Sequence, residues 1–216
     1  MRLYHFTNRQ YGLENIERRR LKIARIGQLN DPFEFLGVAS RSADVRRRYR
    51  ELKNGWDKFM GVLCFSGGWR NPVQWSHYAD HHRGVCLGFD IDAQVHKVDY
   101  VEHRLSPNMR ALKKEGPAAE KHVMQILTTK FLHWSYEDEY RVFPKLNEKD
   151  ERGLYFFPFA NGSTLKQVIV GHDSTVRRTE LSETLGELAP SVECFKARLA
   201  YQTFEVVKQK NASLWK

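Results

Sequence analysis

The segment 134–141 places three charged side chains at alternate positions: Glu137, Glu139 and Arg141. Alternate residues of a β-strand point to the same face, so a strand here would put two carboxylates and a guanidinium side by side. A carboxylate oriented by a neighbouring arginine can accept a hydrogen bond from a sugar hydroxyl or activate a nucleophile. The same pattern also suits a solvated sheet edge with a cross-strand salt bridge, and the sequence leaves both interpretations open.

Histidines and aromatic residues crowd the segment 75–82, which reads WSHYADHH. A helix here would place Trp75 and Tyr78 on one face and His77 and His81 on another. Aromatic side chains at helical spacing are typical of a core, but they also stack on a planar ligand ring. Two histidines four residues apart can chelate a metal, yet the glutamate of the HEXXH motif is replaced by Tyr78, so we expect no metal site.

His5 lies in the aromatic opening segment LYHFT at 3–7. On a strand it shares a face with Leu3, and it is either a half-buried site residue or a structural histidine bonded to a backbone carbonyl. The segment 30–34 reads NDPFE and is rich in turn-forming residues, which predicts a loop beside any ligand.

Other catalytic signatures are absent from the sequence. It contains no P-loop, no G-x-G-x-x-G fingerprint and no G-x-S-x-G elbow. Its three cysteines are Cys64, Cys86 and Cys194, with no C-x-x-C pair, so we expect reduced and mostly buried thiols rather than a disulfide framework.

The composition is that of a folded protein with an uneven charge. The chain has 216 residues, of which 41% are hydrophobic, and a formal net charge of +9. We therefore expect a single domain spanning 1–216. The first 60 residues carry 14 Lys and Arg against 7 Asp and Glu, with arginine triplets at 18–20 and 46–48. Such clusters contact phosphates or form solvated helix faces.

The elements that must position these residues follow from the apolar patterning. Strands are predicted at 3–6, 62–66, 85–89, 137–143 and 165–170, and helices at 42–53, 72–81, 118–132 and 175–188. Segments 193–200 and 201–207 are predicted to pair as a closing hairpin. Strands and helices mix without regular β-α-β alternation, which favours an α+β fold with antiparallel pairing. With no bilayer-length apolar run and no secretory signal after Met1, we expect a cytoplasmic protein with no membrane partner.

The order of several motifs resembles a widespread bacterial family of unknown function, whose members read LYHYT, FNDPFE, WSHYA followed by H.G, and YE.EYR. The corresponding segments here are LYHFT at 3–7, LNDPFE at 29–34, VLCFS at 62–66, WSHYADHHRGVCLGFD at 75–90 and WSYEDEYRVF at 134–143. LKQVIVG at 165–171 looks like a later strand of that family. The resemblance covers roughly residues 1–205.

The ordered His, Tyr and Glu of these motifs are similar to the His-Tyr-Glu pattern of ADP-ribosyltransferases. Carried over by position, the resemblance implies His5, Tyr78 and Glu139 as catalytic residues. In such enzymes the histidine bonds the nicotinamide-side ribose, the tyrosine stacks on nicotinamide, and the glutamate contacts a ribose hydroxyl and supports an oxocarbenium-like transition state. The implied fold is ADP-ribosyltransferase-like, with split antiparallel sheets and peripheral helices.

The resemblance also implies the ligand. NAD is expected as the substrate, no metal is expected, and the ADP-ribose acceptor is a protein or nucleic acid that no motif identifies. Residues expected at NAD are His5, Trp75, Tyr78, Arg25, Glu137 and Arg141, with Arg25 at the pyrophosphate and Glu137 positioning the acceptor. The biological role implied is that of a toxin or phage-defence effector. Two alternatives stay open: a non-catalytic nucleic-acid-binding module that uses the basic N-terminal third, and a histidine-dependent metal nuclease.

Overall fold

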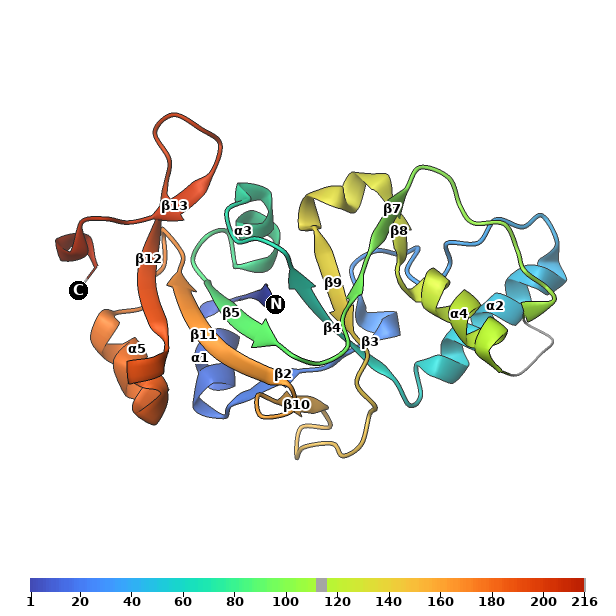
Figure 1. Cartoon of the computed structure of the whole chain (residues 1–216), viewed down its shortest axis with the longest axis horizontal. Coiled ribbons are helices and arrows are strands. Elements are labelled where there is room, and N and C mark those ends of the chain that lie inside the picture. The colour runs from blue at the N-terminus through green and yellow to red at the C-terminus, as the bar shows by residue number, and fades with distance from the viewer. Residues whose placement is uncertain (112–115, 216) are drawn as a thin grey trace.

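The computed structural model describes residues 1–111 and 116–215, and its fold is α+β (Figure 1). The largest sheet has nine strands, in the order β13-β12-β11-β5-β1-β4-β9-β6, with β3 paired beside β4. Its neighbours are antiparallel except for β11 and β12, which are parallel. The strands are β1 (Arg2–Thr7), β3 (Ala24–Arg25), β4 (Gly61–Ser66), β5 (Val85–Ile91), β6 (His96–Lys97), β9 (Glu139–Val142), β11 (Ser163–Val170), β12 (Glu193–Leu199) and β13 (Val206–Lys208).

Two smaller sheets complete the strands of the described residues. One pairs β2 (Arg20–Lys22) with β10 (Phe156–Pro158), and the other pairs β7 (Asp99–Val101) in parallel with β8 (Thr129–Phe131). Short 3-10 turns form η1 (Ile26–Gln28), η3 (Leu132–Glu137), η4 (Gly186–Ser191) and η5 (Ala212–Leu214).

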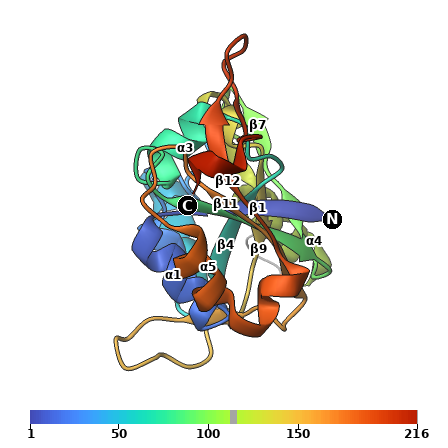
Figure 2. The same ribbon diagram turned by 90° about the vertical axis from the view of Figure 1, so that its left-hand side faces the viewer.

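Both faces of the large sheet are covered. Successive residues of β5 point to opposite faces, and nearly all of them are buried. Val85, Leu87 and Phe89 point into the main core, against α1 (Arg9–Glu17) and α5 (Arg178–Leu185), which pack together (Figure 2). Cys86 points to the opposite face, where α3 (Pro72–Tyr78) contributes the buried Trp75. The side chains of α1 and α3 therefore approach the central strands from opposite sides.

A second group of helices lies at the far end of the molecule from α5 (Figure 1). Helices α2 (Ala43–Trp56) and α4 (Pro117–Leu127) enclose their own apolar cluster with residues of η1 and β4. Tyr49 of α2 and His122 of α4 share a buried hydrogen bond of 2.9 Å. These helices end beside β4 and β8, two strands that supply side chains to the candidate site.

The large sheet opens between β1 and β4. β1 pairs with β5 along its whole length, from Arg2 to Thr7, but it pairs with β4 only through Tyr4 and Ser66. Farther along the same edge, β4 pairs with β3 through Gly61 and Val62, while its other edge pairs with β9. Backbone groups in such an opening need other partners. The ring of His5 supplies one, because its Nδ1 lies 3.0 Å from the carbonyl oxygen of Cys64.

Most predicted elements are confirmed. The strands expected at 3–6, 62–66, 85–89 and 165–170 and the helix expected at 42–53 are present. A closing hairpin is present too, but its second strand is Val206–Lys208 and not 201–207, because most of that segment forms the loop. The hairpin loop between β12 and β13 leaves Tyr201 and Phe204 almost fully exposed. The α+β class is confirmed, but nine of the described strands form one mixed sheet that opens between β1 and β4, and the other four form two small two-stranded sheets, rather than two split antiparallel sheets.

Three predicted boundaries are wrong, and each changes the site. The helix expected at 118–132 ends at Leu127, where Thr128 and Thr129 turn into β8. The helix expected at 72–81 ends at Tyr78. The strand expected from residue 137 begins only at Glu139, because 132–137 form the 3-10 turn η3 and Asp138 is left-handed, with φ of 41°.

None of the helices in the two described ranges is long and apolar enough to cross a membrane.

Candidate active site

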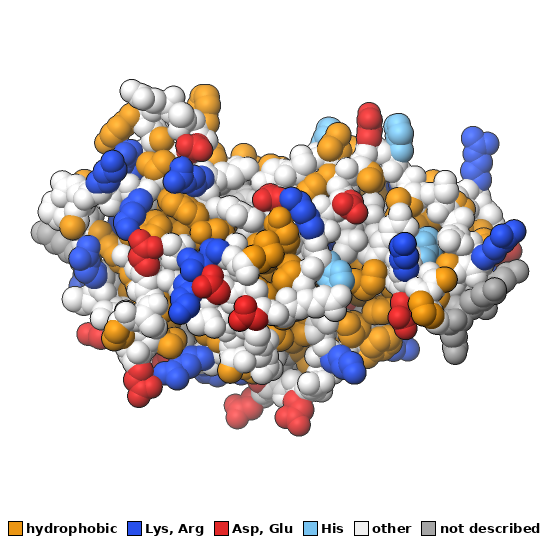
Figure 3. Space-filling model, in the orientation of Figure 1, with side chains coloured by type: hydrophobic (Ala, Val, Ile, Leu, Met, Phe, Trp, Pro, Cys, Tyr) orange, Lys and Arg blue, Asp and Glu red, His pale blue; other side chains and the backbone are white. Residues whose placement is uncertain are grey.

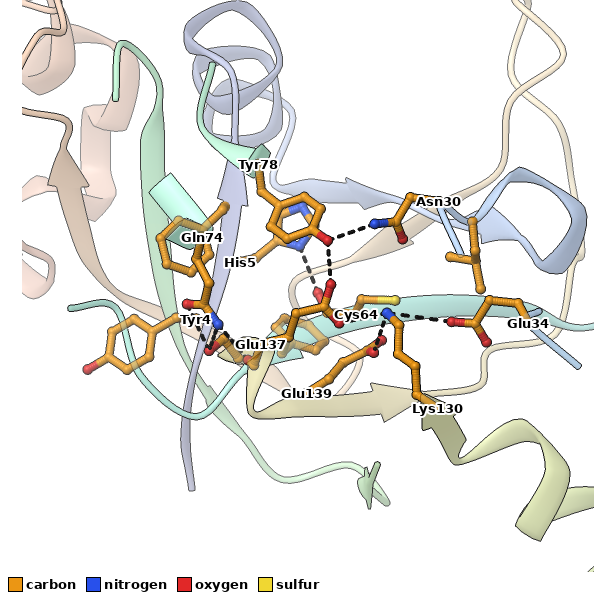
Figure 4. A pocket seen from close by; sticks show the side chains of 14 residues that line it. Tyr4, His5, Asn30, Glu34, Cys64, Gln74, Tyr78, Lys130, Glu137 and Glu139 are labelled. Atoms are coloured by element: carbon orange, nitrogen blue, oxygen red, sulfur yellow. Dashed lines mark hydrogen bonds and ion pairs between the residues drawn. The ribbon is translucent and has the colours of Figure 1, made fainter. Parts of the chain in front are cut away.

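A pocket lies where β1 and β4 part, and it brings together side chains from both strands and from five other segments (Figure 4). Its volume is about 140 Å³. A cavity of about 150 Å³ accommodates a benzene molecule, so the size of this pocket corresponds to about one six-membered ring. The lining residues are Tyr4, His5, Phe6, Leu29, Asn30, Glu34, Cys64, Phe65, Ser66, Gln74, Tyr78, Lys130, Glu137 and Glu139.

One wall of the pocket is backed by five buried charged side chains, which we call the ion cluster: Glu34, Lys130, Glu137, Glu139 and Arg141. None of them is more than 6% exposed. Three carboxylates face two cations, which leaves one net negative charge when all five are ionised. Buried charges are retained only where they are paired and hydrogen-bonded.

Arg141 is the structural centre of the ion cluster. Its guanidinium forms two hydrogen bonds to Glu34, of 2.6 and 2.9 Å, and two to Glu139, of 2.8 and 2.9 Å. A fifth bond, of 2.6 Å, reaches the carbonyl oxygen of Leu127 at the end of α4. The planar fork of arginine matches two carboxylates at once. Arg141 therefore fixes Glu34 and Glu139 from behind, and it does not itself line the pocket.

Glu137 is placed by the turn η3 rather than by a strand. The side-chain amide of Gln74 in α3 donates to the carbonyl oxygens of Tyr136 and Glu137, at 3.0 and 2.6 Å. The left-handed Asp138 then separates Glu137 from β9. As a result, both Glu137 and Glu139 meet the ammonium group of Lys130, at 2.6 and 3.2 Å.

Tyr78 ends α3, and its side chain reaches one of these carboxylates, Glu137. Its hydroxyl donates to Glu137 and accepts a hydrogen bond of 2.7 Å from the side chain of Asn30. Behind it, Asp80, His81 and His82 are all left-handed, with φ of 47°, 52° and 68°. Such conformations are unfavourable for residues other than glycine, and they turn the chain sharply from α3 into β5.

The surroundings of His5 favour its neutral form. Burial lowers its pKa below the ordinary value of 6.5, against the opposing effect of the hydrogen bond to Cys64. Because a carbonyl oxygen only accepts, Nδ1 carries the proton. The remaining ring nitrogen, Nε2, is then free to accept a hydrogen bond.

The pKa values of the two carboxylates beside Lys130 are shifted in opposite directions. Burial raises the pKa of Glu137, with the Lys130 ammonium acting in the opposite direction. Burial also acts to raise the pKa of Glu139, but the cations Arg141 and Lys130 outweigh it and lower the pKa to about 2. Two carboxyl groups with opposite shifts are suited to different roles, one as a proton acceptor and the other as a fixed charge.

The structure brings together four of the residues singled out in the sequence: His5, Tyr78, Glu137 and Glu139. Trp75 is not among the lining residues. It lies on the buried side of α3 and donates through Nε1 to the carbonyl oxygen of Trp69. Arg25 is not among them either, since its guanidinium pairs with Asp57 at 2.6 Å.

The histidine pair expected on one helix face is not formed, because α3 ends before His81. His77 Nδ1 lies 2.9 Å from the Tyr136 hydroxyl, while the side chain of His81 is 78% exposed. Within 1–111 and 116–215, no group of three or more His, Cys, Asp and Glu side chains is placed to hold a metal ion.

Two residues of the ion cluster are not indicated as site residues by the sequence: Lys130 and Glu34. Glu34 belongs to the NDPFE motif, which predicts a loop, yet its buried carboxylate is bound by Arg141, which lies far along the chain in β9. Lys130 carried no signal, since the segment around it was expected to be helical. Only the pairing of β8 with β7 places it at the pocket.

Comparison with known proteins gives one match. Residues 74–142 match a family described as a protein of unknown function (DUF2971). This range is about a third of the chain, and it contains Tyr78, Lys130, Glu137 and Glu139. The curated proteins and the solved structures that were searched contain no match to the chain.

Proposed function

We propose that this chain is an NAD-consuming, ADP-ribosyltransferase-like enzyme whose pocket takes the nicotinamide ring. The observation that carries the proposal is a pocket of one-ring size against a buried ion cluster with one excess negative charge. The nicotinamide ring of NAD is positively charged, and this charge moves to the ribose as the bond between them breaks. A fixed negative charge in a site that excludes water stabilises that change.

In this proposal each pocket residue has a separate task. The carbon–nitrogen bond breaks, its electron pair leaves with nicotinamide, and the ribose carbon becomes oxocarbenium-like. Glu139 stays ionised and stabilises this cation, as carboxylates do in glycoside cleavage. Neutral His5 accepts a hydrogen bond from a ribose hydroxyl, and the ring of Tyr78 packs against nicotinamide. Glu137, with its raised pKa, takes the proton of the attacking acceptor.

A second, more open groove provides space for a substrate that is larger than one ring. Its volume is about 680 Å³, and it shares Phe6 and Tyr78 with the pocket between β1 and β4. Its other lining residues are mostly polar and include Asn8, Arg9 and His77. We assign the remainder of the dinucleotide to this groove, and Arg25, which lies at Asp57, has no part in it.

The test is release of nicotinamide from NAD by the purified protein, with and without cell extract as a source of acceptor. Glu139→Gln keeps the shape of the side chain but removes its charge, so we expect kcat to fall by about 10²-fold or more with a smaller change in KM. Asp138→Asn is the matched control, because Asp138 is the intervening residue and its side chain is half exposed.

The stability of Glu139→Gln must be measured in the same experiment. A carboxylate on an exposed strand would be replaced without effect on folding, but Glu139 is buried and bound by Arg141 and Lys130. Loss of its charge leaves those cations undercompensated, so we expect a lower melting temperature. Nicotinamide release that is undiminished in a folded Glu139→Gln protein would remove Glu139 from the mechanism. Absence of release by the wild type with every acceptor would contradict the proposed function.

A further inference from the structure

Lys130 is a second buried cation at the pocket, and its contacts are unlike those of Arg141. Its ammonium lies 2.6 Å from Glu137, 3.2 Å from Glu139 and 3.6 Å from Glu34. These carboxylates come from three separate segments: the turn η3, strand β9 and the loop after η1. The side chain is only 3% exposed, yet it lines the pocket (Figure 4).

We propose that Lys130 is a positioning residue of the active site, which holds Glu137 as a carboxylate beside Glu139 and so sets the charge of the pocket wall at minus one. The proposal rests on the proposed function for the meaning of that charge. The physical claim about Glu137 does not depend on any substrate.

The first argument is that Glu137 depends on Lys130 in a way that Glu139 does not. Arg141 binds Glu34 and Glu139 but not Glu137. In the part of the chain that the structure describes, Lys130 is the one cation paired with Glu137. The two oxygens of Glu137 are divided between two partners, since Tyr78 donates to Oε1 and Lys130 to Oε2.

The second argument is that Lys130 also holds the turn that carries Glu137. Its ammonium lies 4.9 Å from the ring centre of Trp134, which is a residue of η3. A cation over the face of an indole ring is attracted to it. One side chain of β8 therefore binds the backbone turn through Trp134 and the carboxylate through Oε2.

The expected result of removing this cation follows from the neighbouring charges. Without Lys130, Glu137 is a buried carboxylate next to the ionised Glu139. Burial and a like charge both favour the protonated form, so Glu137 takes up a proton at higher pH. A protonated Glu137 cannot accept the proton of an acceptor, and it removes the negative charge that favours a cationic ring.

The experiment compares the titration of Glu137 in the wild type, Lys130→Met and Lys130→Arg by NMR of ¹³C-labelled glutamate carboxyl groups. The signal that is lost in Glu137→Gln identifies Glu137. We expect Lys130→Met to raise its titration midpoint by about one pH unit or more, as loss of a directly bound charge does. Lys130→Arg should restore the midpoint toward that of the wild type.

The matched control is Lys97→Met. Lys97 pairs with Asp138, the residue between Glu137 and Glu139 in the sequence. The side chain of Lys97 is 58% exposed. We expect no change in the Glu137 midpoint, because solvent screens this charge. If Lys130→Met melts below the temperature of measurement, Lys130→Gln provides the same loss of charge with a group that still donates a hydrogen bond.

A pH profile of nicotinamide release separates this inference from the proposed function. The acidic limb of the profile should move to higher pH in Lys130→Met, in step with the Glu137 midpoint. A folded Lys130→Met protein with an unchanged midpoint overturns the role of Lys130, whatever the activity. A shifted midpoint in a protein whose wild type releases no nicotinamide supports the role of Lys130 and contradicts the proposed function.

Discussion

At the scale of single residues, the ion cluster shows one side chain serving as the support of several others. All of the guanidinium hydrogen-bonding groups of Arg141 donate to Glu34, Glu139 and the last turn of α4. Removing one partner of a buried ion pair leaves the others charged and unpaired, which costs more than the pair contributes in itself. The residues that face the pocket are therefore held in place by one that does not.

We expect Arg141→Met to lower the free energy of unfolding by about 3–5 kcal/mol, the scale for breaking a buried ion pair. Urea denaturation measures this difference. Arg83→Met is the control, because Arg83 pairs with Asp80 on the surface and its replacement should cost less than about 1 kcal/mol. Similar losses in the two variants would contradict the central position of Arg141.

The lowered pKa of Glu139 predicts a specific dependence of stability on pH. Its pKa falls from an ordinary value of 4.5 to about 2 in the folded chain. The unfolded chain therefore binds the proton first, so the stabilisation is complete above about pH 4.5 and is lost as the pH falls toward 2. Glu137 has a raised pKa and contributes no change below pH 4.5.

We expect the wild type to lose about 3 kcal/mol more stability than Glu139→Gln between pH 4.5 and 2, since each pKa unit corresponds to about 1.4 kcal/mol. Acidic groups outside the ion cluster also titrate in this window, but they are present in both proteins and their effects cancel. Parallel pH profiles of the two unfolding free energies would show that Glu139 is not held as a carboxylate.

At the scale of elements, the opening between β1 and β4 creates the pocket. Two strands that paired along their full length would leave no space between them. Here the ladder of β1 with β4 is limited to Tyr4 and Ser66, and the ring of His5 reaches across to the carbonyl oxygen of Cys64. A side chain thus takes the place of a missing backbone partner.

This bridge predicts different effects for two substitutions. His5→Leu removes the side-chain donor to the partly buried carbonyl of Cys64, which should lower the free energy of unfolding by about 1–3 kcal/mol. His5→Gln offers a side-chain amide to the same oxygen and should lose less. Both are measured by urea denaturation, and equal losses would mean that the hydrogen bond is not what joins the two strands.

The same elements show how far the sequence could predict the structure. The strands β1, β4, β5 and β11 were predictable because their apolar residues alternate or form bounded runs. The turn η3 was not, because it depends on the left-handed Asp138 and on hydrogen bonds from Gln74 in α3. His5, Tyr78 and Glu139 were indicated by the order of motifs, but Lys130 and Glu34 join them through long-range pairing that no local pattern encodes.

At the scale of the whole molecule, the positive excess of the first 60 residues is partly used inside the fold. Arg20 pairs with Asp150 at 3.3 Å and Arg25 with Asp57 at 2.6 Å. On the face seen in Figure 3, basic and acidic side chains are interspersed. Within the described ranges, Arg48 and Arg50 of α2 are exposed and form no ion pair, so they are the better candidates for a contact with phosphate.

The nucleic-acid alternative therefore makes a local prediction. Replacing Arg48 and Arg50 together with glutamine should weaken binding of a single-stranded DNA oligonucleotide and reduce the salt slope by about one to two. The comparison is Arg18→Gln with Arg19→Gln, which should have a smaller effect because these side chains face Glu14 and Glu187. Fluorescence anisotropy at several salt concentrations measures both. Salt-independent binding, unchanged by either pair, would assign these arginines to solvated helix faces.

The uncompensated charge of the ion cluster has a consequence for finding ligands without knowing the reaction. A molecule that binds only the folded chain stabilises it by mass action, by about 2.7 kcal/mol at a concentration one hundred times its dissociation constant. A ring with one positive charge balances the wall of the pocket, whereas a neutral ring of the same shape does not. Thermal melts with matched pairs, such as 1-methylnicotinamide against nicotinamide or benzamidine against benzamide, therefore make the melting temperature a measure of the charge of the pocket wall.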